Sequence, residues 1–275
     1  MSAESQPYSA EQLAEMRARF DEDGVVLARG LMRDRLPLLE SAIQAVVDGP
    51  SRLAANYGDP DDPDSSFFSD YSNWRRHKPL EEIIRLPQVA NTVRSVLGSD
   101  TLRIFHDHVL VKKGRAKSTP WHHDQPYYLV DGPKNASVWI TPDSVAAENS
   151  LAYVRGSHKE PGLFMPAKFK SGEAMDPAVE GFRDLTPEVL DDLAERGILV
   201  FSMQPGDALI FDYRTVHGAL PNLSGKQRRA LSIRYLGDDA HLTWNCVNPT
   251  PPFHRMGLKF AEGDPLPEAW FPRVA

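Results

Sequence analysis

Apolar positions in the first hundred residues recur with the spacing of amphipathic helices. Ser9 and Gln12 stand three residues apart, the pattern of a capping box, and predict a helix that continues to Phe20. A short strand is expected over 24–31. Two further helical patterns follow, and the second is broken near Pro87, because proline disrupts the interior of a helix. These predicted helices span 36–47 and 79–97.

From about residue 102 the pattern changes to short β-rich runs separated by turn residues, interrupted by one helix between a capping Thr186 and Arg196. The segment 50–73, rich in Pro, Asp, Ser and Gly, is expected to be a long irregular loop. The order of elements predicts a mainly β fold with flanking helices, in which a closed sandwich or barrel carries the helices on one outer face. We expect a single domain over 1–275, with a helical part at about 1–98 and a β core at about 102–239.

Two predicted strands, 105–112 and 228–235, each have one apolar and one polar face, because successive side chains of a strand point to opposite sides. We expect the apolar faces to dock on the helices, whereas the polar faces meet either water or a polar cavity. The apolar faces consist of Phe105, Val109 and Val111, with Asp107 as an exception, and of Arg229, Leu231, Ile233 and Tyr235. The polar faces consist of His106, His108, Leu110 and Lys112, and of Arg228, Ala230, Ser232 and Arg234.

The composition is that of a globular protein, since 41% of the 275 residues are hydrophobic and 25% are charged. A formal net charge of -7 argues against nucleic acid as a partner, because phosphate binding needs clustered Lys and Arg. The one cysteine, Cys246, excludes an internal disulfide and a thiolate metal site. The first residues lack the pattern of a secretory signal, and no apolar run reaches membrane length. We therefore expect a soluble cytoplasmic protein that binds neither nucleic acid nor membranes.

The run WHHDQPYY at 121–128 places two histidines and an aspartate among aromatic residues, and buried polar groups need partners. If His122 and Asp124 lie on one strand, their side chains share a face and His123 points away. His217 could complete a set of two imidazoles and one carboxylate, the arrangement of non-heme Fe(II) oxygenases. Polar packing at the surface or in the core is the alternative, since a His with an acid two residues later also arises by chance.

Three sequence blocks, in order, resemble the phytanoyl-CoA dioxygenase (PhyH) family of Fe(II)- and 2-oxoglutarate-dependent oxygenases. The resemblance covers most of residues 20–260 and implies a double-stranded β-helix, or cupin-like jelly roll, with the N-terminal helices on one sheet. It implies Fe(II), the cosubstrate 2-oxoglutarate and O2, with succinate and CO2 released as a substrate carbon is hydroxylated. The blocks are WHHDQPYY at 121–128, SVWITPDSVAAENSLAYVRGSHKE at 137–160 and QPGDALIFDYRTVHGALPNLSGKQRRALSIRYLGDD at 204–239.

The resemblance also implies roles for individual residues. His122, Asp124 and His217 stand at the iron-ligand positions, and the carboxylate at 124 favours hydroxylation, because related halogenases have a small residue there. Arg228, eleven residues after His217, has the offset of the arginine that binds the distal carboxylate of 2-oxoglutarate. Trp139 is expected to wall the cosubstrate pocket, although plain core packing explains it equally well.

Two positions depart from the family's usual residues. His123 stands where glutamine is frequent, and Ser150 stands where glycine is common. Neither belongs to the triad, so both bear only on the wall of the pocket.

The polar residues expected to face the cavity suit a compact polar or anionic metabolite as substrate. We expect His108 to face the cosubstrate or the substrate, because it lies opposite the apolar Val109 and Val111. A long acyl-CoA would favour a basic groove, which the acidic charge balance disfavours. The expected substrate contacts are His106, Tyr127, Tyr128 and Arg234.

Other functions remain compatible with these motifs. A cupin-like metal-dependent hydrolase or isomerase would use the triad without 2-oxoglutarate, so that Arg228 would have no carboxylate to bind. A non-enzymatic jelly roll would need no metal, and an acyl-CoA hydroxylase of the same family would differ only in substrate. The sequence predicts no oligomeric state.

Alternation separates the three arginines that follow His217. Arg229 shares the apolar face, so we expect it to extend outward at the edge of that face. Arg228 and Arg234 share the cavity face, and Arg228 is expected to form a bidentate pair with the cosubstrate carboxylate. Arg234 lies six residues on, roughly 20 Å along an extended strand, and is expected to be a substrate or rim contact.

Overall fold

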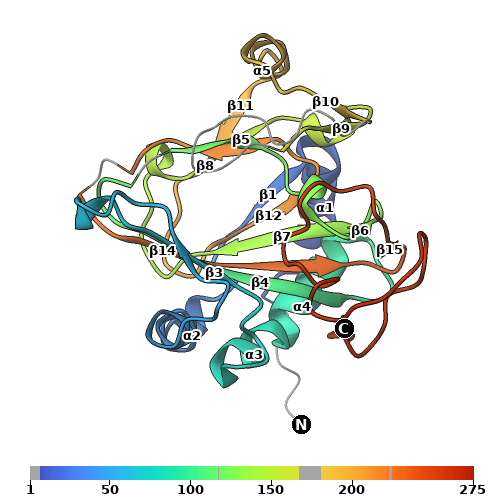
Figure 1. Ribbon diagram of the computed structural model, residues 1–275, viewed down its shortest axis with the longest axis horizontal. Coiled ribbons are helices and arrows are strands. Elements are labelled where there is room, and N and C mark those ends of the chain that lie inside the picture. The colour runs from blue at the N-terminus through green and yellow to red at the C-terminus, as the bar shows by residue number, and fades with distance from the viewer. Residues whose placement is uncertain (1–6, 117, 167–180, 223–224) are drawn as a thin grey trace.

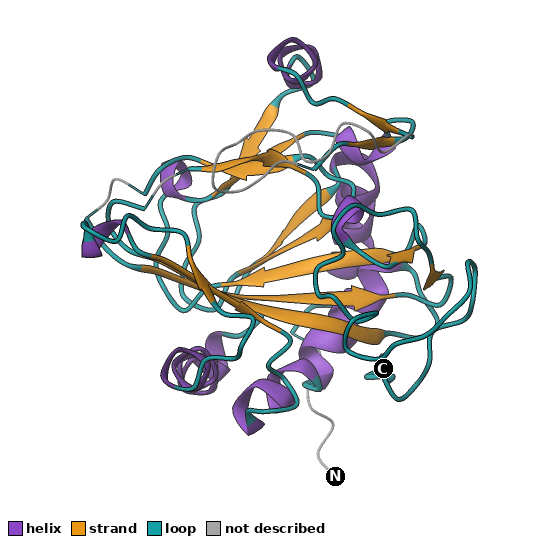
Figure 2. Ribbon diagram, viewed as in Figure 1, coloured by secondary structure: helices purple, strands orange, loops and turns teal. Residues whose placement is uncertain are grey.

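Two antiparallel β-sheets face each other, four helices pack on the outer face of the larger sheet, and a fifth lies on the side of the smaller sheet (Figures 1 and 2). This computed structural model describes residues 7–116, 118–166, 181–222 and 225–275. The arrangement is the double-stranded β-helix expected from the sequence, with the N-terminal helices on one sheet. The helices are α1 (Ala10–Asp23), α2 (Leu36–Asp48), α3 (Lys78–Ile84), α4 (Pro87–Leu97) and α5 (Pro187–Ala194).

The larger sheet has the order β1-β12-β7-β14-β4-β3-β2, and the smaller sheet has the order β11-β8-β13-β5. The larger sheet consists of β1 (Val25–Ala28), β2 (Ala55–Asn56), β3 (Phe67–Tyr71), β4 (Arg103–Lys112), β7 (Asn135–Ile140), β12 (Ala208–Asp212) and β14 (Arg228–Leu236). The smaller sheet consists of β5 (Thr119–His122), β8 (Leu151–Val154), β11 (Ile198–Val200) and β13 (His217–Ala219). Two short ribbons pair β6 (Val130–Asp131) with β15 (His241–Leu242), and β9 (Leu163–Phe164) with β10 (Phe182–Arg183).

The helix boundaries follow the signals in the sequence. The Ser9 hydroxyl accepts a hydrogen bond from the Gln12 backbone N–H at 3.2 Å, and the Gln12 side chain accepts one from the Ser9 N–H at 2.8 Å. Gly24 ends α1 with φ of 80°, a left-handed conformation that glycine adopts without strain. The break near Pro87 is also confirmed, because α3 ends at Ile84 and α4 begins at Pro87.

The apolar faces of β4 and β14 pack on the helices, as alternation predicts. Val109, Val111, Leu231, Ile233 and Tyr235 belong to the buried cluster that α1–α4 share with the larger sheet. The opposite faces of the same strands look toward the smaller sheet, across the interior of the jelly roll.

The expectation for Phe105 was wrong. Phe105 packs instead with Tyr128, Phe253 and Phe271, in a cluster formed with the C-terminal segment. The register between β4 and β14 shifts between Arg234 and the next residue, so the alternation predicted across this position does not hold.

The segment 50–73 is not an irregular loop throughout, as the sequence suggested. It contains β2 and β3, and β3 pairs with β4 at the edge of the larger sheet. This pairing brings side chains of the segment over the interior of the jelly roll.

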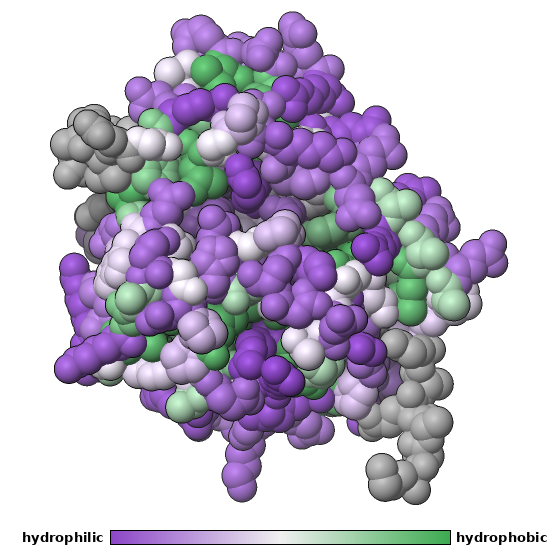
Figure 3. Space-filling view, turned by 90° about the vertical axis from the view of Figure 1, so that its right-hand side faces the viewer, coloured by the Kyte–Doolittle hydropathy of each residue, from purple (hydrophilic) through white to green (hydrophobic). Residues whose placement is uncertain are grey.

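The surface gives no sign of a broad apolar face in the view of Figure 3, where hydrophilic side chains predominate and apolar ones form separate patches. Within the described part of the chain, none of the helices combines the length and apolar character needed to cross a membrane.

Candidate metal centre and cavity

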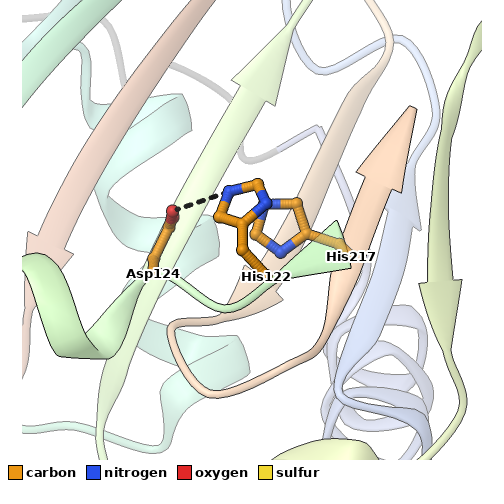
Figure 4. Close-up of side chains that lie close together, drawn as sticks. All are labelled: His122, Asp124 and His217. Atoms are coloured by element: carbon orange, nitrogen blue, oxygen red, sulfur yellow. Dashed lines mark ion pairs between the residues drawn. The ribbon is translucent and has the colours of Figure 1, made fainter. Parts of the chain in front are cut away.

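Two neighbouring strands of the smaller sheet bring the predicted triad together (Figure 4). His122 is the last residue of β5, and His217 is the first residue of β13, where the two are register partners. Asp124 does not lie on the same strand as His122, contrary to the expectation. It follows the end of β5 in a helical backbone conformation, and this turn directs its carboxylate back toward His122.

The three side chains have the geometry of a metal site. One ligand atom from each lies within 4.8 Å of the others, and all three residues are buried. The His122 Nδ1 donates to the Pro120 carbonyl at 2.8 Å, and the His217 Nδ1 donates to the Thr215 carbonyl at 2.9 Å. These bonds fix the proton on Nδ1, so that Nε2 carries the lone pair that a metal ligand needs.

The carboxylate of Asp124 is oriented in the same way. Ser137 on β7 donates to its Oδ2 at 2.8 Å, while Oδ1 lies 3.8 Å from the His122 Nε2. Burial opposes ionisation of Asp124, but the adjacent Arg234 guanidinium, with smaller contributions from the two histidines and the Ser137 hydroxyl, outweighs it and holds the pKa of this carboxyl below its ordinary value. An ionised carboxylate can therefore ligate a divalent metal.

The histidines are in the state that ligation requires. Burial lowers the pKa of His217 to about 4, with His122 the next cause, and burial also lowers the pKa of His122. Neutral imidazoles with one carboxylate on a single face suit Fe(II) and leave coordination positions for other ligands. The residues present thus fit the metal that the sequence predicts.

A cavity of about 460 Å³ opens beside the triad, between the two sheets. All seven residues predicted to contact the cosubstrate or the substrate line it. They are His106, His108, Tyr127, Tyr128, Trp139, Arg228 and Arg234.

One end of the cavity contains Arg228, whose guanidinium lies 5.6 Å from the centre of the Trp139 ring. Arg228 donates to the backbone carbonyl of Asn149, and burial lowers its pKa to about 10. A buried guanidinium at a cavity wall can bind a carboxylate through two parallel hydrogen bonds. The residues at this end therefore fit the distal carboxylate of a 2-oxo acid.

Nearer the triad, the floor of the cavity is polar. His106 Nε2 and Ser232 Oγ are buried, and neither atom has a hydrogen-bond partner in the described ranges. His108 shares a hydrogen bond of 2.7 Å with the Ser69 hydroxyl, and burial lowers its pKa to about 3. The floor therefore offers neutral hydrogen-bonding groups to a bound molecule.

Arg234 lies closer to the metal ligands than expected. Its Nε donates to the Tyr128 hydroxyl at 2.9 Å, and one of its terminal nitrogens lies 3.5 Å from Asp124. Arg234 can therefore position Asp124 as well as contact a substrate.

His123 points away from the triad, as predicted, and accepts a hydrogen bond from the Phe164 N–H at 2.9 Å.

Several lining residues were not predicted. Some come from segments without a recognisable motif, whereas alternation had placed Lys112 and Ser232 on the polar faces without naming them as contacts. The unpredicted residues include Tyr57, Phe67, Ser69, Tyr71, Lys112, Ser232, Asn248 and Thr250.

A jelly roll with two histidines and a carboxylate around one point defines a class of protein, the mononuclear non-heme iron oxygenases. The sequence profile of the family described as phytanoyl-CoA dioxygenase (PhyH) matches residues 8–230. The chain belongs to this family of Fe(II)- and 2-oxoglutarate-dependent oxygenases.

Individual relatives are distant. The dioxygenase lolE1 of Epichloe uncinata is 29% identical over 160 residues, which are 58% of this chain and 55% of lolE1. A probable alpha-ketoglutarate-dependent hypophosphite dioxygenase of Stutzerimonas stutzeri is 27% identical over 181 residues, 62% of this chain and 57% of that protein. The chain thus spans little more than half the length of these curated relatives.

A solved structure has the same fold over almost the whole chain. The non-heme alpha-ketoglutarate-dependent epimerase SnoN from nogalamycin biosynthesis superposes with a TM-score of 0.75 at 18% identity. The superposition covers 97% of this chain and all of SnoN. At this identity the likeness supports the fold alone.

Proposed function

We propose that this chain hydroxylates a small polar or anionic metabolite in a reaction that consumes O2 and 2-oxoglutarate and releases succinate and CO2. The observation that supports this most strongly is that the triad and the buried Arg228 line one cavity. A cupin-like hydrolase or isomerase would have no use for Arg228, and a non-enzymatic jelly roll would have none for the triad. The family assignment also favours the oxygenase.

When bound, iron and 2-oxoglutarate would allow O2 to oxidise a C–H bond of the substrate. In this proposal His122, Asp124 and His217 hold the metal from one side, which leaves the other side to the cosubstrate and O2. Arg228 anchors the distal carboxylate of 2-oxoglutarate, and Trp139 forms a flat wall beside it.

Other residues of the chain orient the substrate and exclude water. His106 and Ser232 would give their unpaired polar atoms to the substrate, and His108 would contact the substrate or the cosubstrate. Tyr127 and Tyr128 contribute aromatic surface, which removes water from the reacting centre.

The charge of the cavity supports an anionic or polar substrate. Lys112, Arg228 and Arg234 line it, while Asp124 is the only carboxylate among the described lining residues. Relatives named for ectoine and for hypophosphite belong to the same range of small molecules. A cationic substrate without an anionic group of its own would be disfavoured, because the basic side chains of the cavity would repel it.

The test is to measure O2 consumption and succinate formation with Fe(II) and 2-oxoglutarate across a library of small polar metabolites. We expect both rates to rise together with a polar or anionic compound and to vanish when 2-oxoglutarate is omitted. Faster turnover of a long acyl-CoA would contradict the proposed substrate class. Conversion of a compound without 2-oxoglutarate would point instead to a cupin-like hydrolase or isomerase.

A further inference from the structure

Two non-glycine residues of the described chain have a left-handed backbone conformation, and both lie at the cavity. They are Ser72, with φ of 63°, and Asn248, with φ of 49°. Asn248 lines the cavity itself, whereas Ser72 directly follows Tyr71, which lines it. Residues other than glycine rarely adopt this conformation, and such outliers cluster at functional sites. The backbone is thus specialised where Tyr71 and Asn248 meet the cavity.

Asp107 holds the turn at Ser72 in place. Its carboxylate accepts hydrogen bonds from the backbone N–H groups of Asn73 and Trp74 at 2.9 Å and 2.8 Å, and its carbonyl accepts one from the Ser72 N–H at 2.9 Å. Asp107 is fully buried and interrupts the apolar face of β4. A buried carboxylate needs such donors. These bonds explain the exception on β4 and fix the backbone that carries Tyr71.

A second turn, after β15, fixes Asn248. The Thr250 hydroxyl donates to the Asn248 carbonyl at 3.2 Å, and the Thr250 N–H donates to the Tyr127 carbonyl at 2.8 Å. Tyr127 lies three residues after the metal ligand Asp124. Asn248 is therefore tied to the block that carries two of the metal ligands.

The polar ends of both side chains are available to a bound molecule. Within the described ranges, neither the Tyr71 hydroxyl nor the Asn248 side-chain amide has a hydrogen-bond partner. Asn248 is exposed and Tyr71 is half-buried, so a ligand in the cavity can reach them. Burial raises the pKa of Tyr71, which keeps its hydroxyl protonated. Both groups can therefore donate and accept a hydrogen bond.

An apolar wall lies on the same side of the cavity as Tyr71. Tyr57, Phe67 and Leu110 belong to the lining, and the rings of Tyr57 and Phe67 lie 5.6 Å apart. Phe67 and Tyr71 share one face of β3, because they stand an even number of residues apart. Ligand sites commonly combine apolar walls with a few polar groups that fix the orientation of the bound molecule. This wall therefore suits a hydrocarbon portion of the substrate.

The cations of the cavity have partners elsewhere. Arg234 lies 3.5 Å from the carboxylate of Asp124. Arg228 donates to the Asn149 carbonyl, and Lys112 is its register partner at the cosubstrate end. A substrate carboxylate on the apolar side would leave water without gaining a cation as partner, which costs free energy. An uncharged polar group is therefore favoured on that side.

We propose that Tyr71 and Asn248 select a substrate that carries an uncharged hydroxyl or carboxamide group next to a hydrocarbon portion. The inference rests on the proposed function and narrows its substrate class. A hydroxyl or a carboxamide both donates and accepts, so it pairs with the Tyr71 hydroxyl and with either end of the Asn248 amide. A carboxylate only accepts, which leaves the amide oxygen of Asn248 without a donor.

Anaerobic titration calorimetry on the protein loaded with Fe(II) and 2-oxoglutarate can test this selection. The probes share one ring and differ in the polar group: cyclohexylmethanol, cyclohexanecarboxamide and cyclohexanecarboxylate. We expect the alcohol or the amide to bind at least about tenfold more tightly than the carboxylate. The tighter of the two distinguishes a hydroxyl from a carboxamide substrate. Acetamide, which lacks the ring, should bind at least about tenfold more weakly than cyclohexanecarboxamide.

Two variants make the test specific to these residues. Tyr71→Phe keeps the ring and Asn248→Gly keeps the backbone, because glycine adopts a positive φ without strain. Each should weaken binding of the alcohol and the amide about 3- to 10-fold through the loss of one hydrogen bond, and leave binding of the carboxylate nearly unchanged. Asn245→Ala is the matched control and should keep the wild-type preference, because Asn245 is exposed in the same segment and lies outside the cavity lining.

Equal or tighter binding of the carboxylate by the wild type would overturn the inference, and so would failure of all three ring probes to bind. An unchanged preference in both Tyr71→Phe and Asn248→Gly would overturn the role of these residues. None of these results touches the proposed function, which fails if the Fe(II)-loaded wild type does not bind 2-oxoglutarate in the same calorimeter. If one variant fails to fold, the wild-type preference and the other variant decide the question.

Discussion

Arg228, Arg229 and Arg234 lie on one strand, and each contacts a different part of the molecule. Arg228 lies in the wall of the cavity, at the end away from the iron ligands. Arg229 points to the helical side, where it forms an ion pair of 2.7 Å with Asp143. Arg234 lies 3.5 Å from Asp124, which links it to the metal centre. Alternation along β14 separates Arg229 from Arg228 and Arg234, and the six residues between Arg228 and Arg234 give these two different neighbours on the cavity face.

Alanine variants of these arginines should give three different defects. Arg228→Ala should raise the 2-oxoglutarate concentration for half-maximal turnover by about a hundredfold or more, because a bidentate charged contact is lost. Arg229→Ala should change it by less than about threefold, since a partly exposed ion pair contributes little. Arg234→Ala should instead weaken Fe(II) binding and turnover through Asp124. Titrations of 2-oxoglutarate and Fe(II) separate these effects, and a larger cosubstrate defect in Arg229→Ala than in Arg228→Ala would contradict the assignment.

Pairs of strands, rather than single segments, build the site. The pairing of β13 with β5 makes His217 the register partner of His122, so residues almost a hundred positions apart meet at one metal site. The pairing of β14 with β4 sets Lys112 beside Arg228 at the far end of the cavity. The helices α1–α4 pack on the opposite face of the larger sheet and support its strands from outside.

The helix α1 allows a test of this supporting layer. Ser9→Ala removes the capping box and should lower the free energy of unfolding by about 1 kcal/mol. Ser41→Ala is the matched control, because Ser41 is exposed inside α2, where alanine is a good helix former and the change should be a few tenths of a kcal/mol or less. Urea denaturation measures both variants. Equal stability of the two would mean that the cap does not stabilise α1.

At the scale of the whole molecule, segments that are far apart in the chain line the cavity together. Tyr57 and Phe67 come from the segment that includes β2 and β3, and Asn248 and Thr250 come from the segment after β15. The metal ligands lie between the two sheets, so metal binding is coupled to the folded state of the jelly roll.

Fe(II) should therefore stabilise the folded protein. At a metal concentration of a hundred times Kd, the gain is about 2.7 kcal/mol, which should raise Tm by roughly 5 °C or more. His217→Ala should remove most of this rise. His241→Ala is the control and should retain it, because His241 lies on β15, outside the cavity lining. Anaerobic thermal melts with and without Fe(II) measure the difference, and an undiminished rise in His217→Ala would contradict the proposed ligand set.

The sequence by itself determined the features that depend on local chemistry. The capping box, the helix break at Pro87 and the two faces of β14 follow from a few adjacent residues and were predicted correctly. The residues expected at the cavity also line it. For those on β4 and β14, the period of a strand fixes which side chains share a face. The family motifs added His217 and Arg228, which are distant in the chain from the block around His122.

Only the tertiary structure decided the features that depend on contacts between distant segments. Asp124 lies in a turn after β5, and its position in the triad depends on that turn. Phe105 does not lie on the apolar face of β4, because the register between β4 and β14 shifts beside it. The strands β2 and β3 form in a segment rich in Pro, Asp and Ser because β3 pairs with β4. Neither local propensity nor alternation encodes such pairings, since their free energy comes from the partner strand and from burial in the assembled fold.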